Sequence, residues 1–259
     1  MDWSKTKTIF IITFLLLNVF LGYQLGEKRT AGNLNIINQV SFQDNLAENN
    51  IQILINDVEK PQVGSSIIGS TVKYDLETLE GQLLDQDLSL IMNDTMILAD
   101  LVTPYKLSES SIEAGVVNFL QEFIINGDEY RFTVFNDENN TINVHQLYKE
   151  KPIDNFESGR AQIVLHLNED LEIEAYDQIY IEISQEIREQ EMLSLIKAIE
   201  VLFNNQYIPA NTVLENAELG YYSLLPASGE FQVYAPMWKI NINGVYYYVN
   251  AIDGTIQTN

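Results

Sequence analysis

The chain contains no cysteine, and only two of its 259 residues are histidine. Without cysteine it can form neither a disulfide framework nor a thiolate nucleophile, and a lipid anchor on a cysteine is excluded as well. Basic side chains are also scarce, 14 against 37 acidic ones, so the formal net charge is −23. We therefore expect no nucleic-acid partner, because binding to phosphates requires Lys and Arg, and no flat adhesion to an anionic membrane surface.

The common catalytic signatures are missing too. The sequence has no P-loop, no G-x-G-x-x-G, no G-x-S-x-G and no H-E-x-x-H pattern. His145 and His166 each lie in an alternating, strand-like segment, where a packed or surface role is the more common one. The Asn-rich stretch 135–143 lacks the spacing of a calcium-binding loop. We predict a protein that is not an enzyme, with no catalytic residue, no metal site and no cofactor.

The first 25 residues contain the only long apolar run. Lys5 and Lys7 precede eighteen mostly apolar residues from Thr8 to Leu25, which as a helix would rise about 27 Å, close to the roughly 30 Å of a bilayer core. The run is longer than the apolar part of a secretory signal and ends without a small-x-small cleavage site. The pattern favours an uncleaved transmembrane helix, and a cleaved signal peptide with an unusual site is the alternative.

The orientation of this span follows from what comes after it. Positive residues lie on both sides, since Lys28 and Arg29 follow the span, and the charge rule alone is nearly balanced. A long domain without a second apolar span is commonly translocated. We expect a single-pass protein of the cell membrane, with residues 1–7 cytoplasmic, 8–25 transmembrane, 26–41 a juxtamembrane linker and 42–259 an extracellular domain.

Hydrophobic periodicity predicts an α+β fold for the extracellular domain, with antiparallel sheets packed with helices. One helix is expected to begin at a cap on Ser108 or Ser110 and to end at Gly127, and a short one is expected over 42–49. The clearest helix lies within 191–205, with an apolar face made of Leu193, Ile196, Ile199, Leu202 and Phe203. Strands are expected within 51–55, 65–75, 88–102, 130–135, 141–148, 161–167 and 172–184.

The C-terminal segment predicts a β-hairpin. Asn243-Gly244 joins two alternating stretches and is the strongest short hairpin signal. Trp238, Ile240 and Tyr248 are expected on the sheet that faces the second helix. An Ile-Asn-Gly motif at residue 125 recurs at residue 242, which leaves open two related halves or a chance match of turn residues.

One polar residue interrupts the apolar run. Asn18 lies near its middle, with Phe14 one helical turn before it and Gly22 one turn after it. An amide in hydrocarbon requires a partner, and a small residue lets a second helix approach closely. We hypothesise that Phe14, Asn18 and Gly22 form a face that binds a partner's helix. In the alternative, Asn18 snorkels or bonds to its own helix.

Two stretches carry a resemblance to a known family. Both ends of the chain resemble the YycI (WalI) regulatory proteins of Gram-positive bacteria. At the N-terminus the resemblance rests on Met1-Asp2-Trp3 and Lys5-Thr6-Lys7. In the tail it rests on Pro236, Trp238, Asn243-Gly244, the run 248–251 and Gly254. The size and the single anchor agree with this family, while the middle, about 60–200, contributes little to the resemblance.

The resemblance implies a function in signalling. YycI proteins act with YycH on the essential sensor histidine kinase YycG (WalK), which controls cell-wall metabolism. The membrane helices take part in that complex, and members differ in the sign of their effect. The expected partners are therefore such a kinase, a YycH-like regulator and the lipid bilayer. The alternative is an extracellular ligand-binding or PepSY-like protease-inhibitory module, because the tail hairpin also resembles PepSY.

Overall fold

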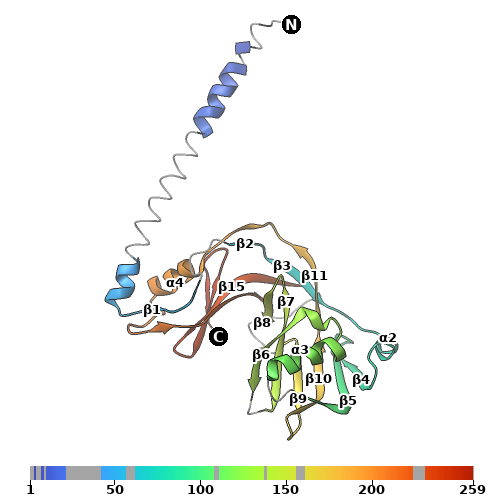
Figure 1. The fold of residues 1–259 in the computed structure, drawn as a ribbon. Coiled ribbons are helices and arrows are strands. Elements are labelled where there is room, and N and C mark those ends of the chain that lie inside the picture. The colour runs from blue at the N-terminus through green and yellow to red at the C-terminus, as the bar shows by residue number, and fades with distance from the viewer. Residues whose placement is uncertain are drawn as a thin grey trace. The chain divides into compact units, whose positions relative to one another are not determined.

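The computed structural model describes residues 3, 7–8, 10–21, 42–56, 62–107, 111–136, 139–155, 161–223 and 231–258. These residues form a mixed α+β fold that is mostly sheet with few helices (Figure 1), as the periodicity predicts. The chain divides into two compact units. The first comprises Met1–Ile53 with Pro209–Val213, and the second comprises Leu54–Ile208 with Leu214–Asn259.

The first unit contains helical residues 10–21 and a short helix over 42–48, one residue shorter than predicted. Behind the short helix, the backbone N–H of Asn211 donates to the carbonyl of Asn49, and that of Gln52 donates to Thr212. The strand predicted over 51–55 is reduced to β1 (Gln52–Ile53), which pairs with β13 (Val213–Leu214). None of the helices in the described part of the chain is both long enough and apolar enough to span a bilayer. The predicted linker 26–41 lies outside the described residues.

A single large sheet dominates the second unit. Thirteen strands of the described residues join it, and its main path runs β11-β3-β15-β14-β8-β7-β9-β10-β5-β4. The strands are β3 (Ile67–Thr71), β4 (Gln86–Ile91), β5 (Met96–Lys106), β6 (Tyr130–Asn136), β7 (Thr141–Tyr148), β8 (Lys151–Asn155), β9 (Ile163–Leu167), β10 (Glu172–Ile179), β11 (Ile181–Glu186), β14 (Ala217–Ser223), β15 (Gln232–Ile242), β16 (Val245–Asn250) and β17 (Ile256–Thr258). Two short strands, β2 (Gln62–Gly64) and β12 (Gln190–Met192), pair separately.

The sheet passes from one part of this unit to the other at β7. The first half of β7, up to Val144, pairs with β9, whereas Leu147 and Tyr148 at its end pair with β8. Strand β8 then continues the sheet through a parallel pairing with β14. We call β4–β7, β9, β10 and α3 (Ile112–Phe123) the first lobe, and β3, β8, β11, β14–β17 and α4 (Leu195–Asn204) the second lobe (Figure 1).

Buried glutamines fill the gap that this change of partner leaves between the strands. The side-chain amide of Gln146 donates to the carbonyl of Ile181 at 2.9 Å and accepts from its N–H at 2.9 Å. The side-chain oxygen of Gln162 accepts from the backbone N–H of Gln146 at 3.1 Å. Both glutamines are buried. Their side chains therefore replace the ladder hydrogen bonds that neighbouring backbone would supply, and no buried N–H or C=O of Ile181 is left unpaired at that point.

Helix α3 covers the core of the first lobe with Val116, Phe119 and Leu120. The cap predicted at Ser108 or Ser110 is wrong, because the Ser111 hydroxyl accepts from the N–H of Ala114 at 3.2 Å; Ser108 and Ser110 lie outside the described residues. The predicted end at Gly127 is also wrong, since α3 ends at Phe123. Gly127 packs so closely that a Cβ there would lie 1.7 Å from the carbonyl oxygen of Leu120, so this close approach requires glycine.

Helix α4 of the second lobe begins later than the sequence predicts. Met192 ends a strand, and the helix starts at Leu195, with Leu195, Ala198, Ile199 and Leu202 buried. Ile199 and Leu202 confirm part of the predicted face, whereas Ile196 and Phe203 are only half-buried. Leu193 precedes the helix, and its backbone carbonyl accepts from the indole N–H of Trp238 at 2.8 Å. The predicted face is shifted because the apolar residues of the strand continue into those of the helix without a break in periodicity.

The tail hairpin is confirmed as β15 and β16, joined by Asn243 (φ 53°) and Gly244 (φ 88°). Trp238, Ile240 and Tyr248 are buried as expected. They do not share one face, however, since Tyr248 pairs across the ladder with Lys239, and alternate residues of a strand point to opposite sides. The earlier Ile-Asn-Gly motif precedes a 3-10 turn after α3, so the two motifs occupy different structural positions.

Replacing Trp238 is expected to weaken the second lobe. Trp238→Ala removes a side chain that is 7% exposed and its hydrogen bond to Leu193, so the free energy of unfolding should fall by about 3–5 kcal/mol. Urea denaturation of the full chain in detergent measures this. Phe231→Ala, which truncates an aromatic ring that is 67% exposed, is the control and should change little. Equal stability of the two variants would contradict the assigned packing.

Replacing Gln146 is expected to lower the free energy of unfolding at the junction between the two lobes. Gln146→Leu keeps the side-chain bulk but leaves the buried N–H and carbonyl of Ile181 without their partner, which should cost about 2–5 kcal/mol. Gln185→Leu makes the same change at an exposed position of β11 and should be nearly neutral. Urea denaturation again measures the difference, and a neutral Gln146→Leu would show that the junction is not stabilised by this amide.

Candidate functional site

The predicted partner-binding face begins in the helical residues 10–21. Phe14 and Asn18 lie side by side on one face of this helix, next to Phe10, Ile11, Leu15 and Val19, and together these six line a shallow, mostly apolar groove. The side chain of Phe14 is 61% exposed. Gly22, the third predicted residue, lies outside the described residues. The structure thus brings Phe14 and Asn18 together and leaves the position of Gly22 untested.

The surroundings of the Asn18 amide bear on two hypotheses: that it bonds to a partner's helix, or that it snorkels or bonds to its own helix. Within the part of the chain that the structure describes, no hydrogen bond of the Asn18 side chain is recorded. An amide that bonded back to its own helix would pair with a carbonyl one turn earlier. Both hypotheses for Asn18, a bond to a partner's helix and snorkelling or bonding within its own helix, stay predictions.

The two histidines lie apart, on different strands of the first lobe. On β7, the Nδ1 of His145 lies 2.7 Å from the hydroxyl of Thr133, and its Nε2 lies 3.6 Å from the carboxylate of Asp154. On β9, the Nε2 of His166 lies 3.3 Å from the carboxylate of Asp177. Each histidine is bound to neighbours on its own sheet, which agrees with the packed or surface role that the sequence favours.

Two tyrosines of the second lobe lie near Asp154. The rings of Tyr222 and Tyr248 contact edge to face, with their centres 4.9 Å apart. Burial, with the charge of Asp154 adding to it, raises the pKa of Tyr222 far above its usual value and that of Tyr248 to about 12. Both hydroxyls are therefore neutral at physiological pH. They can form hydrogen bonds in this cluster, but neither serves as a base there.

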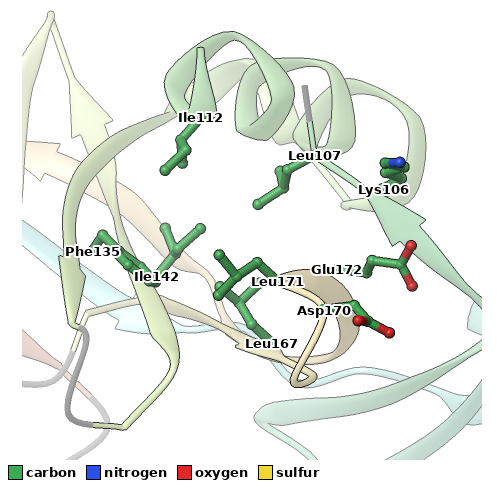
Figure 2. A pocket seen from close by; sticks show the side chains of 9 residues that line it. All are labelled: Lys106, Leu107, Ile112, Phe135, Ile142, Leu167, Asp170, Leu171 and Glu172. Carbon is green, nitrogen blue, oxygen red and sulfur yellow. The ribbon is translucent and has the colours of Figure 1, made fainter. Parts of the chain in front are cut away.

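A pocket that the sequence did not predict lies at one end of the first lobe. It encloses about 530 Å³ between the start of α3 and the ends of the strands below it. Figure 2 shows Leu107 and Ile112 pointing toward Phe135, Ile142 and Leu171 across the cavity, with charged side chains grouped at one side. The full lining is Lys106, Leu107, Ile112, Phe135, Ile142, Leu167, Asp170, Leu171 and Glu172.

This pocket was missed because its residues come from six separate segments of the chain. One signal was present in the sequence. The turn Asn168-Glu169-Asp170-Leu171-Glu172 places an apolar residue among three acidic ones, although turns usually contain polar residues or glycine. The lining of the pocket combines apolar walls with acidic groups at its edge.

Comparison with known proteins gives the chain its family. The family model described as YycI protein matches residues 32–252. The chain belongs to the YycI family. This confirms the family resemblance and extends the match through the middle of the chain, whereas the N-terminal stretch that also carried the resemblance precedes the matched residues. The YycI family is a regulatory one, and membership links the chain to the YycFG two-component system.

Solved structures provide two further similarities. An uncharacterized protein from Eubacterium rectale ATCC 33656 aligns with a TM-score of 0.49 at 12% identity, covering 76% of this chain and 86% of that protein. YycH from Bacillus subtilis aligns with a TM-score of 0.47 at 15% identity, covering 73% of this chain and 52% of YycH. The comparison with curated proteins finds no match.

Proposed function

We propose that this YycI-family chain is a membrane-anchored regulator of a sensor histidine kinase of the YycG (WalK) type, acting together with a YycH-like partner. In this proposal residues 8–25 span the cell membrane, residues 1–7 are cytoplasmic and the domain over 42–259 is extracellular. The anchor contacts helices of the partners, and the exterior domain adds further contacts. Family membership over residues 32–252 is the observation that carries the proposal.

The N-terminal helix supports a role for the anchor in binding. All described side chains over 10–21 are exposed, including Phe14, Leu17 and Phe20. Apolar side chains of this kind are stable in lipid or against another helix, and they are costly in water. Asn18 adds a polar group that hydrocarbon cannot satisfy, so a partner helix that bonds to it would be favoured over lipid at that face.

Charge supports a position of the rest of the chain away from an anionic membrane surface. The net charge of −23 disfavours close contact with anionic lipid headgroups. A soluble, acidic domain held away from the membrane by a polar linker can instead meet the exterior domains of a kinase and of a sister regulator. Regulation then requires that the chain bind one signalling state of the kinase better than the other.

The anchor is expected to remain on the mature protein. Mass spectrometry of protein extracted from membranes should find the segment Met1–Tyr23 still attached, because the apolar run is long and lacks a cleavage site. Protease applied to intact spheroplasts should digest the exterior domain and spare the first residues. Mature protein that begins near Gly26 or Ala31 and is released into the medium would contradict the anchor.

The double variant Asn18→Leu, Gly22→Ile is expected to insert normally but to bind its partners less well. The variant loses the amide of Asn18 and the close helix approach that Gly22 allows. Its binding free energy should be weaker by about 0.6–2 kcal/mol, or about 3- to 30-fold in affinity. Co-purification from solubilised membranes with the kinase as bait measures binding, and phosphorylation of the response regulator measures kinase output.

Matched changes on other faces of the same helix serve as controls. Leu17→Ile and Phe20→Leu keep the span apolar and should leave co-purification close to wild type. Equal recovery and unchanged kinase output for the double variant would rule out the Phe14, Asn18 and Gly22 face as the contact.

A further inference from the structure

The pocket of the first lobe has apolar side chains on its floor and walls, and the described residues leave its interior empty. Ile142 and Leu167 form a buried floor, while Ile112 and Leu171 are 40% and 47% exposed at its walls. Its volume of about 530 Å³ falls within the range of about 300–1,000 Å³ typical of ligand sites. An apolar group that entered would exchange water contact for contact with six apolar side chains (Figure 2).

The position of Leu171 is unusual for the turn that carries it. The loop of three residues between Asn168 and Glu172 ends at Leu171, whose φ is 59°. Hairpins of this length favour glycine at that position, because a Cβ is strained in the left-handed region. The Asn168 side chain holds the turn by accepting from the N–H groups of Asp170 and Glu172 at 3.0 and 2.9 Å. A leucine here costs stability and gives the pocket one of its walls.

The charge around this leucine is acidic. Glu169, Asp170 and Glu172 flank it in the turn, and Lys106 lies opposite Glu172 in the register of β5 and β10. No ion pair of the exposed Asp170 carboxylate is recorded within the described residues. The edge of the pocket therefore carries more negative than positive charge, and a cationic group next to an apolar one would be complementary to it.

We propose that this pocket is a docking site for a segment of a partner protein in which a large apolar side chain lies next to Lys or Arg. The apolar side chain enters between Ile112, Leu171 and Phe135, and the basic group pairs with Asp170. A second copy of this chain is a poor occupant because each copy carries a net charge of −23, and an anionic membrane is repelled by the same carboxylates. The proposal is independent of the membrane anchor.

Three peptides test separately whether binding requires the apolar side chain and whether it requires the basic group. The full chain, held in nanodiscs of zwitterionic lipid and labelled at Ile, Leu and Val methyl groups, is titrated with the hexapeptides KLFKLK, ELFELE and KSSKSK. The first should shift the methyl signals of Ile112, Ile142 and Leu171. The second keeps the apolar residues with reversed charge, and the third keeps the charge without apolar residues. Both should bind at least about threefold more weakly.

Variants of the pocket separate binding from folding. Leu171→Gly should bind KLFKLK about tenfold more weakly, since an apolar contact is lost, while its melting temperature stays the same or rises because the left-handed strain is relieved. Asp170→Asn should weaken binding about two- to fourfold. Asp87→Asn removes the same charge at an exposed position of β4, outside the pocket, and should bind as the wild type does.

Several results would overturn the proposal. They are methyl shifts that map elsewhere, equal binding of ELFELE, and unchanged affinity of Leu171→Gly for KLFKLK. Sedimentation of the wild type provides a further test. A dimer that Leu171→Gly abolishes would show that the occupant is a second copy, and binding of anionic vesicles that depends on Leu171 would show that it is lipid.

Discussion

The large sheet depends on the buried amide of Gln146. Where β7 leaves β9 and turns to β8, the start of β11 pairs with β3, and the backbone N–H and carbonyl of Ile181 bond to the side chain of Gln146 rather than to a neighbouring strand. Gln162 pairs in turn with the backbone of Gln146. In a low-dielectric interior such bonds are strong, and a missing one is costly. The two lobes can share one sheet because these two side chains complete its hydrogen bonding.

The two lobes pack their helices against the sheet through different contacts. In the first, aromatic rings of α3 stack and meet edge to face with strand residues, as Phe119 does with Phe123, Tyr105 and Tyr176. In the second, the segment before α4 is held by an indole hydrogen bond from Trp238. In the first lobe, the described residues leave a pocket between the start of α3 and the strands below it. In the second lobe, Trp238 is buried.

Charge and apolar surface are distributed unevenly along the chain. The helix over 10–21 presents apolar side chains on every face, with one amide at Asn18. The rest of the chain is acidic, and its pocket has apolar walls with carboxylates at the edge. Surfaces of the first kind favour another helix in lipid, and surfaces of the second kind favour a basic segment in water.

Local features of the fold followed from the sequence because they depend on residues a few positions apart. Asn243-Gly244 specifies its hairpin through the left-handed backbone that both residues tolerate, and strand alternation located most of the strands. The boundary at Met192 and Leu195 was misjudged, since an apolar strand that runs into an apolar helix has no break in composition. Ser111 was missed as a cap because three neighbouring serines compete for that role.

By itself the sequence determined the acidic charge, the absence of thiol chemistry, the α+β class, the tail hairpin and the family resemblance of the two ends. Only the tertiary structure decided what the glutamines and Leu171 do. Gln146 bonds to a residue 35 positions away, and the pocket joins segments between Lys106 and Glu172. Periodicity and turn preferences describe neighbours along the chain, whereas burial and hydrogen-bond completion depend on which distant strands meet, and that is settled only when the whole sheet has formed.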